Sequence, residues 1–237
     1  MELMIGIIVC LLFVIFTHYT KIFNPKGCVT AFILGTAILL LTDLYWLILL
    51  IFFVLTNYIV TIYQIDEKRK RSWSIMESIR NEHNILANGF VPILIVFLSF
   101  FIRDPIMKLA YITSIASASS DTFASEIGIL SDKVVLITNF KMVKPGTDGG
   151  ISLMGELAAL LGAFSMAFFG WFLLFKLDPV YGFRSILYPT AFGFLGCQID
   201  SILGSLFERK NYLNKGEVNL ISMAVATTLS IPFLAYL

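Results

Sequence analysis

The segment from Asp121 to Gly150 carries the residue types that could do chemistry. It reads DTFASEIGILSDKVVLITNFKMVKPGTDGG and combines acids, lysines and clustered glycines in a chain that is otherwise strongly apolar. Carboxylates and ammonium groups held against a bilayer are costly unless they bind something, so they indicate a functional site. Glycines let backbone N–H groups close on an anion, and lysines add positive charge. The segment therefore predicts phosphate chemistry at a membrane surface.

The acidic first part of this segment, DTFASEIG, is suited to a divalent cation. On a helix, Asp121, Ser125 and Gly128 lie near one face, because positions three and four apart are neighbours. Glu126 lies beside that face. A carboxylate with a glycine one or two turns later could hold Mg²⁺ and leave room for a phosphate. A solvated helix end would show the same spacing, so both interpretations stay open at this point.

The last part of the segment, VKPGTDGG, is suited to a phosphate. Its proline stiffens a turn, its glycines allow unusual dihedral angles, and its threonine and aspartate offer side-chain oxygens beside two lysines. It directly precedes an apolar span whose N-terminal amides would favour an anion. A plain tight turn before a helix is the alternative. The residues concerned are Lys141, Lys144, Pro145, Gly146, Thr147, Asp148, Gly149 and Gly150.

Asp200 is the acid with the fewest alternative explanations. It lies in an apolar span among glycines and a serine spaced three or four apart, which predicts a small-residue face for close helix packing. An aspartate on that face must be neutralised, paired or bound to a cation. We expect Asp200 to bind a metal ion together with Asp121 and Glu126, and a pair with lysine or arginine is the alternative.

Further polar residues lie at other membrane boundaries and are candidates for binding nucleotide or phosphate. They occur in the segments RNEHNILANG, CQIDS and GEVN. Boundary asparagines often only cap helices, so their assignment is the weaker one. The candidates are Arg80, Asn81, Asn88, Ser201 and Asn219.

Composition defines the class of protein that must position these residues. With 58% hydrophobic, 14% aromatic and 14% charged residues, the chain is a polytopic membrane protein and not a soluble domain. Its 3 cysteines lie far apart in apolar surroundings without a CxxC spacing, which predicts core thiols. We expect a single all-α domain over residues 1–237, a membrane helical bundle whose cytoplasmic loops form the site.

The apolar segments predict about eight transmembrane helices, with a range of about six to eight, since most segments approach the roughly 20 residues needed to cross hydrocarbon. The second is short. The fifth is rich in serine and threonine near its end, and we expect it to line the site, because polar helices are tolerated where they face protein or a wet cavity. The expected spans are 3–20, 28–42, 44–63, 85–102, 105–122, 151–175, 184–207 and 218–237.

The basic residues predict the orientation in the membrane. When the spans alternate across the bilayer, most of the 17 lysines and arginines fall in one set of loops, which the positive-inside rule makes cytoplasmic with both termini outside. The same threading brings the polar segments together on that face. We therefore predict a multi-pass integral membrane protein with its active site on the cytoplasmic face. The run KRKR at residues 68–71 is interpreted as a topology marker that contacts anionic head groups, and no nucleic acid is expected.

Four separated motifs resemble a known family. RNEHNILANG, DTFASEIG, VKPGTDGGISLMGELAALLGA and GFLGCQIDSILGSLFERK together resemble the integral-membrane family that contains the plant phytyl-phosphate kinase of tocopherol synthesis and its archaeal, bacterial and animal relatives. The likeness runs from residue 75 to the C-terminus and keeps the order of the motifs. The chain departs from the family pattern at Asn84, Asp148 and the pair Asn214 and Lys215.

The resemblance implies a Mg²⁺-dependent kinase. It would transfer a phosphoryl group from a nucleoside triphosphate, with CTP favoured, to an isoprenoid monophosphate such as phytyl, farnesyl or geranylgeranyl phosphate. Such transfer depends on positioning and charge neutralisation, which we assign to Asp121, Lys141 and Asp200 as catalytic residues. Two other classes remain open. A membrane transporter would also place acids and broken helices at a cavity, and a cytidylyltransferase would form a CDP-lipid and release pyrophosphate.

Overall fold

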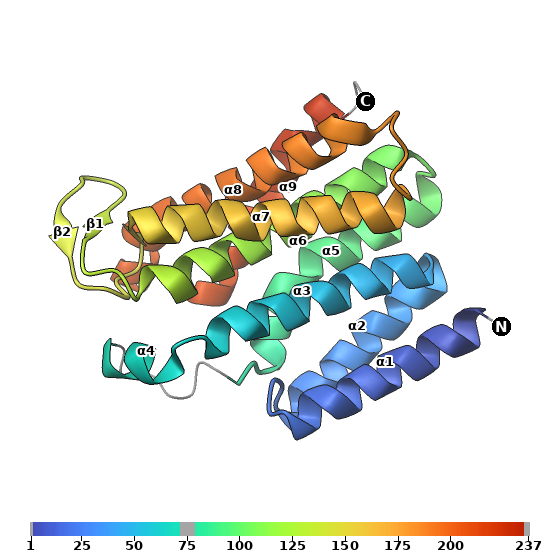
Figure 1. The fold of residues 1–237 in the computed structure, drawn as a ribbon, viewed down its shortest axis with the longest axis horizontal. Helices are drawn as coiled ribbons and strands as arrows, with labels where there is room; N and C mark the ends of the chain where they lie inside the picture. Colours follow the sequence, from blue (N-terminus) through green and yellow to red (C-terminus); the bar gives the residue numbers. More distant parts are fainter. Residues whose placement is uncertain (1, 72–78, 235–237) are drawn as a thin grey trace.

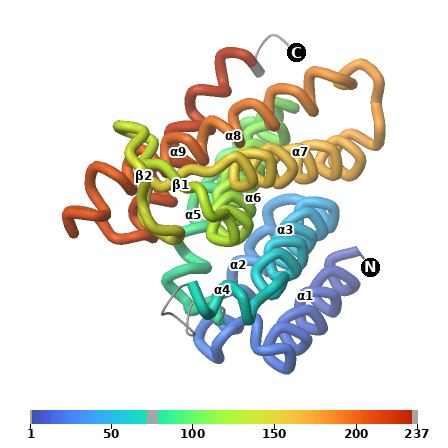
Figure 2. The backbone as a smooth tube through the Cα atoms, turned by 60° about the vertical axis from the view of Figure 1, so that its left-hand side comes forward, coloured from blue at the N-terminus to red at the C-terminus, as the bar shows by residue number. Residues whose placement is uncertain are grey.

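The long helices of the protein run side by side in two groups, which one helix joins and which also pack on each other directly (Figure 1). The computed structural model describes residues 2–71 and 79–234. Helix α5 packs on α2 on one side and on α6 and α9 on the other (Figure 2). The N-terminal group is α1 (Glu2–Tyr19), α2 (Pro25–Leu41), α3 (Leu44–Ile62) and the short α4 (Ile65–Arg71), the joining helix is α5 (Glu82–Phe101), and the C-terminal group is α6 (Pro105–Gly128), α7 (Leu153–Leu174), α8 (Gly182–Leu206) and α9 (Lys215–Leu234).

Each expected span corresponds to one of these helices, which confirms an all-α polytopic bundle. Among the described residues, α1, α3, α5, α7 and the stretch Gly182–Lys210 are long and apolar enough to cross a membrane. Helix α2 is apolar but has only 17 residues, as its short apolar run predicted. The fifth span is longer than expected, because α6 continues without a break to Gly128. The acidic motif is therefore helical.

Helix α6 is the central helix, in contact with α3, α5, α7, α8 and α9. Its serines and threonines between Thr113 and Ser120 are buried, and most of their hydroxyls have a hydrogen-bond partner within the protein. Thr113 donates to the carbonyl of Leu109 in its own helix, and Ser120 donates to the carbonyl of Ala159 on α7. These contacts explain how a polar helix is accommodated in an apolar bundle, since it faces protein and not lipid.

Glycines allow α7 and α8 to approach α6 closely. A Cβ added to Gly193 of α8 would lie 2.7 Å from the Cβ of Ala116, and one added to Gly162 of α7 would lie 2.9 Å from the carbonyl oxygen of Ser119. A Cβ on Gly196 would collide with the side chain of Ser117. The small-residue face expected on α8 is thus confirmed, and it packs against α6.

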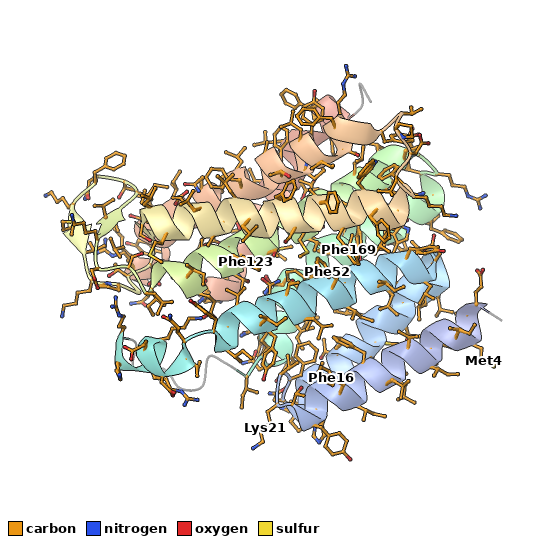
Figure 3. All side chains as sticks on the ribbon, in the orientation of Figure 1. Met4, Phe16, Lys21, Phe52, Phe123 and Phe169 are labelled. Atoms are coloured by element: carbon orange, nitrogen blue, oxygen red, sulfur yellow. The ribbon has the colours of Figure 1, made fainter. Side chains whose placement is uncertain are left out.

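Large apolar side chains cover the outside of the bundle (Figure 3). Met4 and Phe16 of α1 are 63% and 46% exposed, as expected for side chains that face lipid. Between the two helix groups, the rings of Phe52 on α3 and Phe169 on α7 pack with centroids 4.0 Å apart. The cysteines are buried and free, as predicted.

The connection between α6 and α7 contains a small antiparallel sheet that the sequence did not predict. Its strands are β1 (Val134–Leu136), β2 (Met142–Val143) and β3 (Gly150–Ile151), in the order β2-β1-β3. The pairing of Leu136 with Gly150 fixes the end of the glycine-rich loop. Strands of two or three residues are too short to show an alternating pattern, so periodicity could not reveal them.

The packing of α8 on α6 can be tested with two alanine variants. We expect Gly193→Ala to lower the free energy of unfolding in detergent by about 1–3 kcal/mol, because the added Cβ meets the Ala116 side chain and backbone. Thermal unfolding followed by circular dichroism measures the change. Gly182→Ala in the same helix is the control, since nothing lies within 4 Å of its added Cβ. Equal melting temperatures for the two variants would contradict the close approach.

Candidate functional site

The polar connections of the protein gather at one end of the bundle, the left-hand end in Figure 1. Phe23 in the α1–α2 turn forms a β-bridge with Arg80 before α5. The hydroxyls of Thr138 in the β1–β2 hairpin and Ser205 at the end of α8 lie 2.8 Å apart. The first helix begins, and the last described turn of α9 ends, at the opposite end. The predicted convergence of the polar segments on one face is confirmed.

A cavity of about 510 Å³ opens at this end. The C-terminal ends of α3, α6 and α8 form its walls, together with the first residues of α7 and α9 and the glycine-rich loop. A cavity of this volume is in the range of small-molecule and cofactor sites. The predicted residues that line it are Asp121, Ser125, Glu126, Gly146, Thr147, Asp148, Gly149, Gly150, Asp200 and Ser201.

Two acids from different helices face each other in this cavity. The side chains of Asp121 on α6 and Asp200 on α8 lie within hydrogen-bonding reach of one another. Asp200 is one turn beyond Gly196, so the face that packs on α6 also presents this carboxyl group. The positive charges of Lys215 and Arg80 act on Asp121. Two carboxylates this close repel unless a proton or a cation lies between them.

The side chain of Asp200 is also held from α9. The Ser222 hydroxyl donates to Asp200 Oδ2 at 3.1 Å. With its amide oriented to donate, Asn219 Nδ2 lies 3.1 Å from the same oxygen. Asn219 therefore positions Asp200 and does not itself line the cavity. These contacts fix one carboxylate oxygen of Asp200.

The glycine-rich loop packs directly on α8. Gly146 and Gly149 have positive φ values of 80° and 73°, a conformation that glycine adopts without strain. A Cβ on Gly149 would lie 2.5 Å from the carbonyl oxygen of Ser201. Some of the loop amides are already used, because Thr147 N donates to Lys144 O and Gly150 N donates to Thr147 O. In the described structure, the amides of Gly146, Asp148 and Gly149 make no backbone hydrogen bond and could contact an anion.

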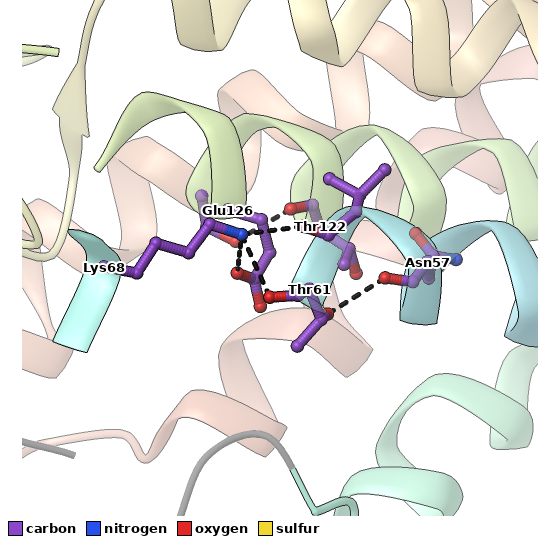
Figure 4. A network of polar contacts seen from close by, with 7 residues as sticks. Asn57, Thr61, Lys68, Thr122 and Glu126 are labelled. Carbon is purple, nitrogen blue, oxygen red and sulfur yellow. Dashed lines mark hydrogen bonds and ion pairs between the residues drawn. The ribbon is translucent and has the colours of Figure 1, made fainter. Parts of the chain in front are cut away.

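Lys68 forms a wall of the cavity, which the sequence interpretation missed (Figure 4). Its side chain is only 6% exposed, and its ammonium group lies 2.8 Å from Glu126 Oε2. It also donates to the carbonyl oxygens of Val60 and Thr61 at the end of α3. A cation in this position compensates the negative end of the helix. The predicted contact with anionic head groups is therefore wrong for Lys68, whose ammonium group is bonded within the protein, whereas the role of the KRKR run as a topology marker stays a prediction.

The pairing of Glu126 with Lys68 bears on the expected metal site. Among the described residues, no group of three histidine, cysteine or acidic side chains is placed to hold a metal ion. Mg²⁺ in nucleotide enzymes often uses one or two carboxylates and takes its other ligands from phosphates and water. The facing carboxyl groups of Asp121 and Asp200 fit such a site, and Glu126 lines the cavity beside them.

Several predicted residues lie outside the large cavity. Lys141 and Lys144 are exposed on the β1–β2 hairpin and the following loop, and Pro145 is not in the cavity wall. Asn81 caps α5, since its side chain accepts from the backbone N–H of Asn84, which was the alternative expected for a boundary asparagine. Arg80 and Asn88 line a second, smaller cavity.

Other residues of the cavity wall were missed. Lys215 opens α9, and Glu156 lies in the first turn of α7, where it accepts a hydrogen bond of 2.7 Å from Gln198. Both lie within a few residues of a predicted motif, and this proximity was the available signal. The missed polar residues of the wall are Thr61, Lys68, Arg69, Ser152, Glu156, Glu208 and Lys215.

Comparison with known proteins identifies the family. The family described as "Integral membrane protein DUF92" matches residues 8–227. The chain belongs to this family. An uncharacterized membrane protein of Methanocaldococcus jannaschii is 36% identical over 225 residues, which is 94% of this chain and 91% of that protein. The resemblance drawn from the motifs is confirmed.

Two plant relatives differ in how much of the chain they match. Protein VTE6 of Arabidopsis thaliana, chloroplastic, is 35% identical over 130 residues, which is 53% of this chain and 38% of that protein. Protein PGR of the same plant is 27% identical over 229 residues, 87% of this chain and 79% of that protein. No solved structure matches the chain.

The glycine-rich loop offers a matched pair of variants. We expect Gly149→Ala to displace the loop from α8, because the new Cβ would meet the backbone of Ser201 and Ser205 at a positive φ. Gly146→Ala adds the same strain in φ, but its Cβ would meet only Ile129, at 3.5 Å. Limited proteolysis of the loop in detergent should therefore accelerate more in Gly149→Ala. Equal cleavage rates in both variants would contradict the packing.

Proposed function

We propose that the protein is a prenyl-phosphate kinase. It transfers a phosphoryl group from CTP, or another nucleoside triphosphate, to an isoprenoid monophosphate such as phytyl, farnesyl or geranylgeranyl phosphate and gives the diphosphate. The observation that carries the proposal is the facing pair Asp121 and Asp200 beside the glycine-rich loop, at one end of a membrane bundle. Family membership supports it, because the four motifs that line up in this chain resemble those of the plant phytyl-phosphate kinase.

Asp121 and Asp200 would hold Mg²⁺, which would supply positive charge to neutralise the donor phosphates. The chain supplies the rest of the charge. Lys215 and Arg69 line the same cavity and bring positive charge to a triphosphate. The amides of Gly146, Asp148 and Gly149 lie in the loop beside the pair, and short backbone stretches of this kind bind phosphate oxygens. Lys141 and Lys144, on the hairpin and the loop after it, remain proposed contacts for the nucleotide.

The acceptor needs no general base, because a monophosphate is already ionised. Donor and acceptor are both anions that repel each other, so positioning and neutralisation are the main tasks of the protein. Ser125 and Ser201, which line the cavity, offer hydroxyl groups for orienting phosphate oxygens. The tail of the acceptor can stay among the helices and lipid. We place the reaction on the cytoplasmic face, since the basic residues concentrate at the same end of the bundle.

The location of the cavity favours an enzyme over a secondary transporter. Transporters place their binding sites near the bilayer midplane, between helices that break there. Here the acids lie in the last two turns of α6 and of α8, at the end of the bundle where the polar connections gather. A cytidylyltransferase would use the same pair of acids, so only its products distinguish it from the kinase.

The proposal is tested by product analysis. Detergent-purified protein is incubated with Mg²⁺, geranylgeranyl monophosphate and each labelled nucleoside triphosphate, and the lipid and nucleotide products are separated by chromatography. We expect geranylgeranyl diphosphate and an equal amount of CDP. Release of pyrophosphate would replace the kinase by cytidylyl transfer, and unchanged nucleotide in every reaction would contradict both.

Two variants connect that reaction to the acids. We expect Asp121→Asn and Asp200→Asn each to lose at least about 100-fold in turnover, as for removal of groups that stabilise transition-state charge. Both should still insert in the membrane. Asp132→Asn is the control, because this carboxylate is exposed and pairs with Arg71 at the surface. Full activity in both site variants would remove the assignment.

A further inference from the structure

Helix α4 forms one side of the large cavity, although only one of its side chains is buried. It has 7 residues, fewer than the roughly 12–15 that an isolated helix needs to be stable in water. Ile65, Lys68 and Arg69 lie on one face, because positions three and four apart are neighbours, and all three line the cavity. Lys68 is the buried residue of α4, whereas Ile65 is half-buried and the others are exposed. The deepest contact of this helix with the bundle is therefore made by a lysine.

The ammonium group of Lys68 is surrounded by oxygen atoms from two other helices (Figure 4). Lys68 Nζ donates to Val60 O at 2.6 Å and to Thr61 O at 3.1 Å, at the end of α3, and it lies 2.8 Å from Glu126 Oε2 on α6. An ammonium group has three N–H donors, so each of them has an acceptor here. The two carbonyls are among the last four of α3, which have no partner within the helix. Together these oxygens form a site for a primary ammonium ion.

A polar network between α3 and α6 fixes the position of these oxygens. The Thr61 hydroxyl donates to Asn57 O at 2.9 Å. Asn57 is fully buried, and Ser119 Oγ on α6 donates to its Oδ1 at 3.4 Å. The ammonium site is therefore part of the packing of α3 on α6, and α4 supplies only its occupant.

The other charged contacts of α4 contribute less to its attachment. Arg71 lies 3.0 Å from Asp132, but the side chain of Asp132 is 88% exposed, and exposed ion pairs contribute little. Lys70 pairs with Glu67 of α4 itself. Such a pair stabilises the helix but does not attach it to the bundle. The buried ammonium group of Lys68 is therefore the main anchor of α4.

We propose that the oxygens at the end of α3 and on Glu126 form an ammonium site, and that its occupant Lys68 holds α4 at the cavity and so positions Arg69. The inference rests on the proposed function and deepens it, because Arg69 is one of the cations that bring positive charge to the triphosphate. Arg69 follows Lys68 directly in the chain and lines the same cavity. The three donors of Lys68 are all used within the protein, so Lys68 acts through Arg69 and is a positioning residue.

The anchor is tested without nucleotide by hydrogen–deuterium exchange of residues 65–71, measured by mass spectrometry on the full-length protein in detergent. Lys68→Ala should speed the exchange of this segment at least about tenfold, as for loss of hydrogen bonds to a charged group. Lys70→Ala is the control and should exchange like wild type, because this lysine is exposed and pairs with Glu67 of the same helix. Equal exchange in Lys68→Ala and wild type would overturn the inference.

Chemical rescue distinguishes an ammonium site from support by a long side chain. Propylammonium replaces the atoms that Lys68→Ala removes, and it should restore slow exchange in that variant. Tetramethylammonium carries the same charge without N–H donors and should restore nothing. Fast exchange of Lys68→Ala in propylammonium would overturn the inference.

A second variant keeps the inference testable if Lys68→Ala does not fold. Lys68→Met keeps the length of the side chain without the charge or the donors. It should exchange fast with or without propylammonium, because its own side chain fills the space. Slow exchange in Lys68→Met would show that the ammonium group is not needed and would overturn the inference.

The positioning of Arg69 is tested by nucleotide binding. Binding of CTP with Mg²⁺, measured by equilibrium dialysis, should weaken about tenfold in Arg69→Ala and by a similar factor in Lys68→Ala, as for loss of one charge-assisted phosphate contact. The double variant should bind no more weakly than Arg69→Ala, because both changes remove the same contact. Propylammonium should restore binding in Lys68→Ala but not in the double variant. Losses that add in the double variant would overturn the positioning role.

The two experiments separate this inference from the proposed function. If the wild-type protein binds no nucleotide while the exchange results are as expected, the proposed function alone is refuted and the ammonium site stands. If nucleotide is bound and turned over while Lys68→Ala exchanges as slowly as wild type, this inference alone is refuted.

Discussion

The candidate site depends on two aspartates that face each other at the end of an apolar bundle. Asp121 and Asp200 come from helices that lie close together, because Gly193 and Gly196 of α8 pack on the backbone and small side chains of α6. Repulsion between the carboxylates is thus built into the helix packing. A divalent cation bound together with a nucleotide would relieve this repulsion. The pair of carboxylates therefore favours binding of such a metal–nucleotide ligand.

The basic residues near Asp121 and Asp200 differ in the groups that they contact. Lys68 neutralises Glu126 and satisfies carbonyl groups at the end of α3, so it supports the cavity wall. Lys215 acts on the aspartate pair from the start of α9. Arg80 lines the second, smaller cavity. A site for two anionic substrates needs such separate positive groups, because one cation cannot neutralise donor and acceptor at once.

The sequence predicted the helices because an apolar run is a local feature of the chain. It predicted the two aspartates because acids in such runs are rare. Apolar runs of sufficient length define membrane helices, and an acid such as Asp200 inside one of them has few explanations. The short sheet was missed because strands of two or three residues carry no period. Lys68 was missed because its burial depends on contacts with Glu126 on α6 and with carbonyl groups at the end of α3, which no residue pattern in the KRKR run reveals.

The sequence also did not predict which lysines line the cavity. Lys141 and Lys144 precede the glycines in the chain, yet the hairpin and the loop turn them toward solvent. Lys215 was not selected, although it lies one residue before the GEVN motif and lines the cavity. Proximity in sequence therefore identified the loop but not the cations that face it. The packing of the helices, including α4 on the end of α3, decides which charges meet.

The most direct test of the central claim is electron paramagnetic resonance of Mn²⁺ added to the purified protein with CTP. Mn²⁺ binds the same oxygen ligands as Mg²⁺. Its paramagnetic resonance signal differs between the free and the bound ion. We predict a bound signal that requires the nucleotide and disappears in both Asp121→Asn and Asp200→Asn, but persists in Asp132→Asn. A bound signal that persists in both site variants would contradict the claim that these two acids form the metal and nucleotide site.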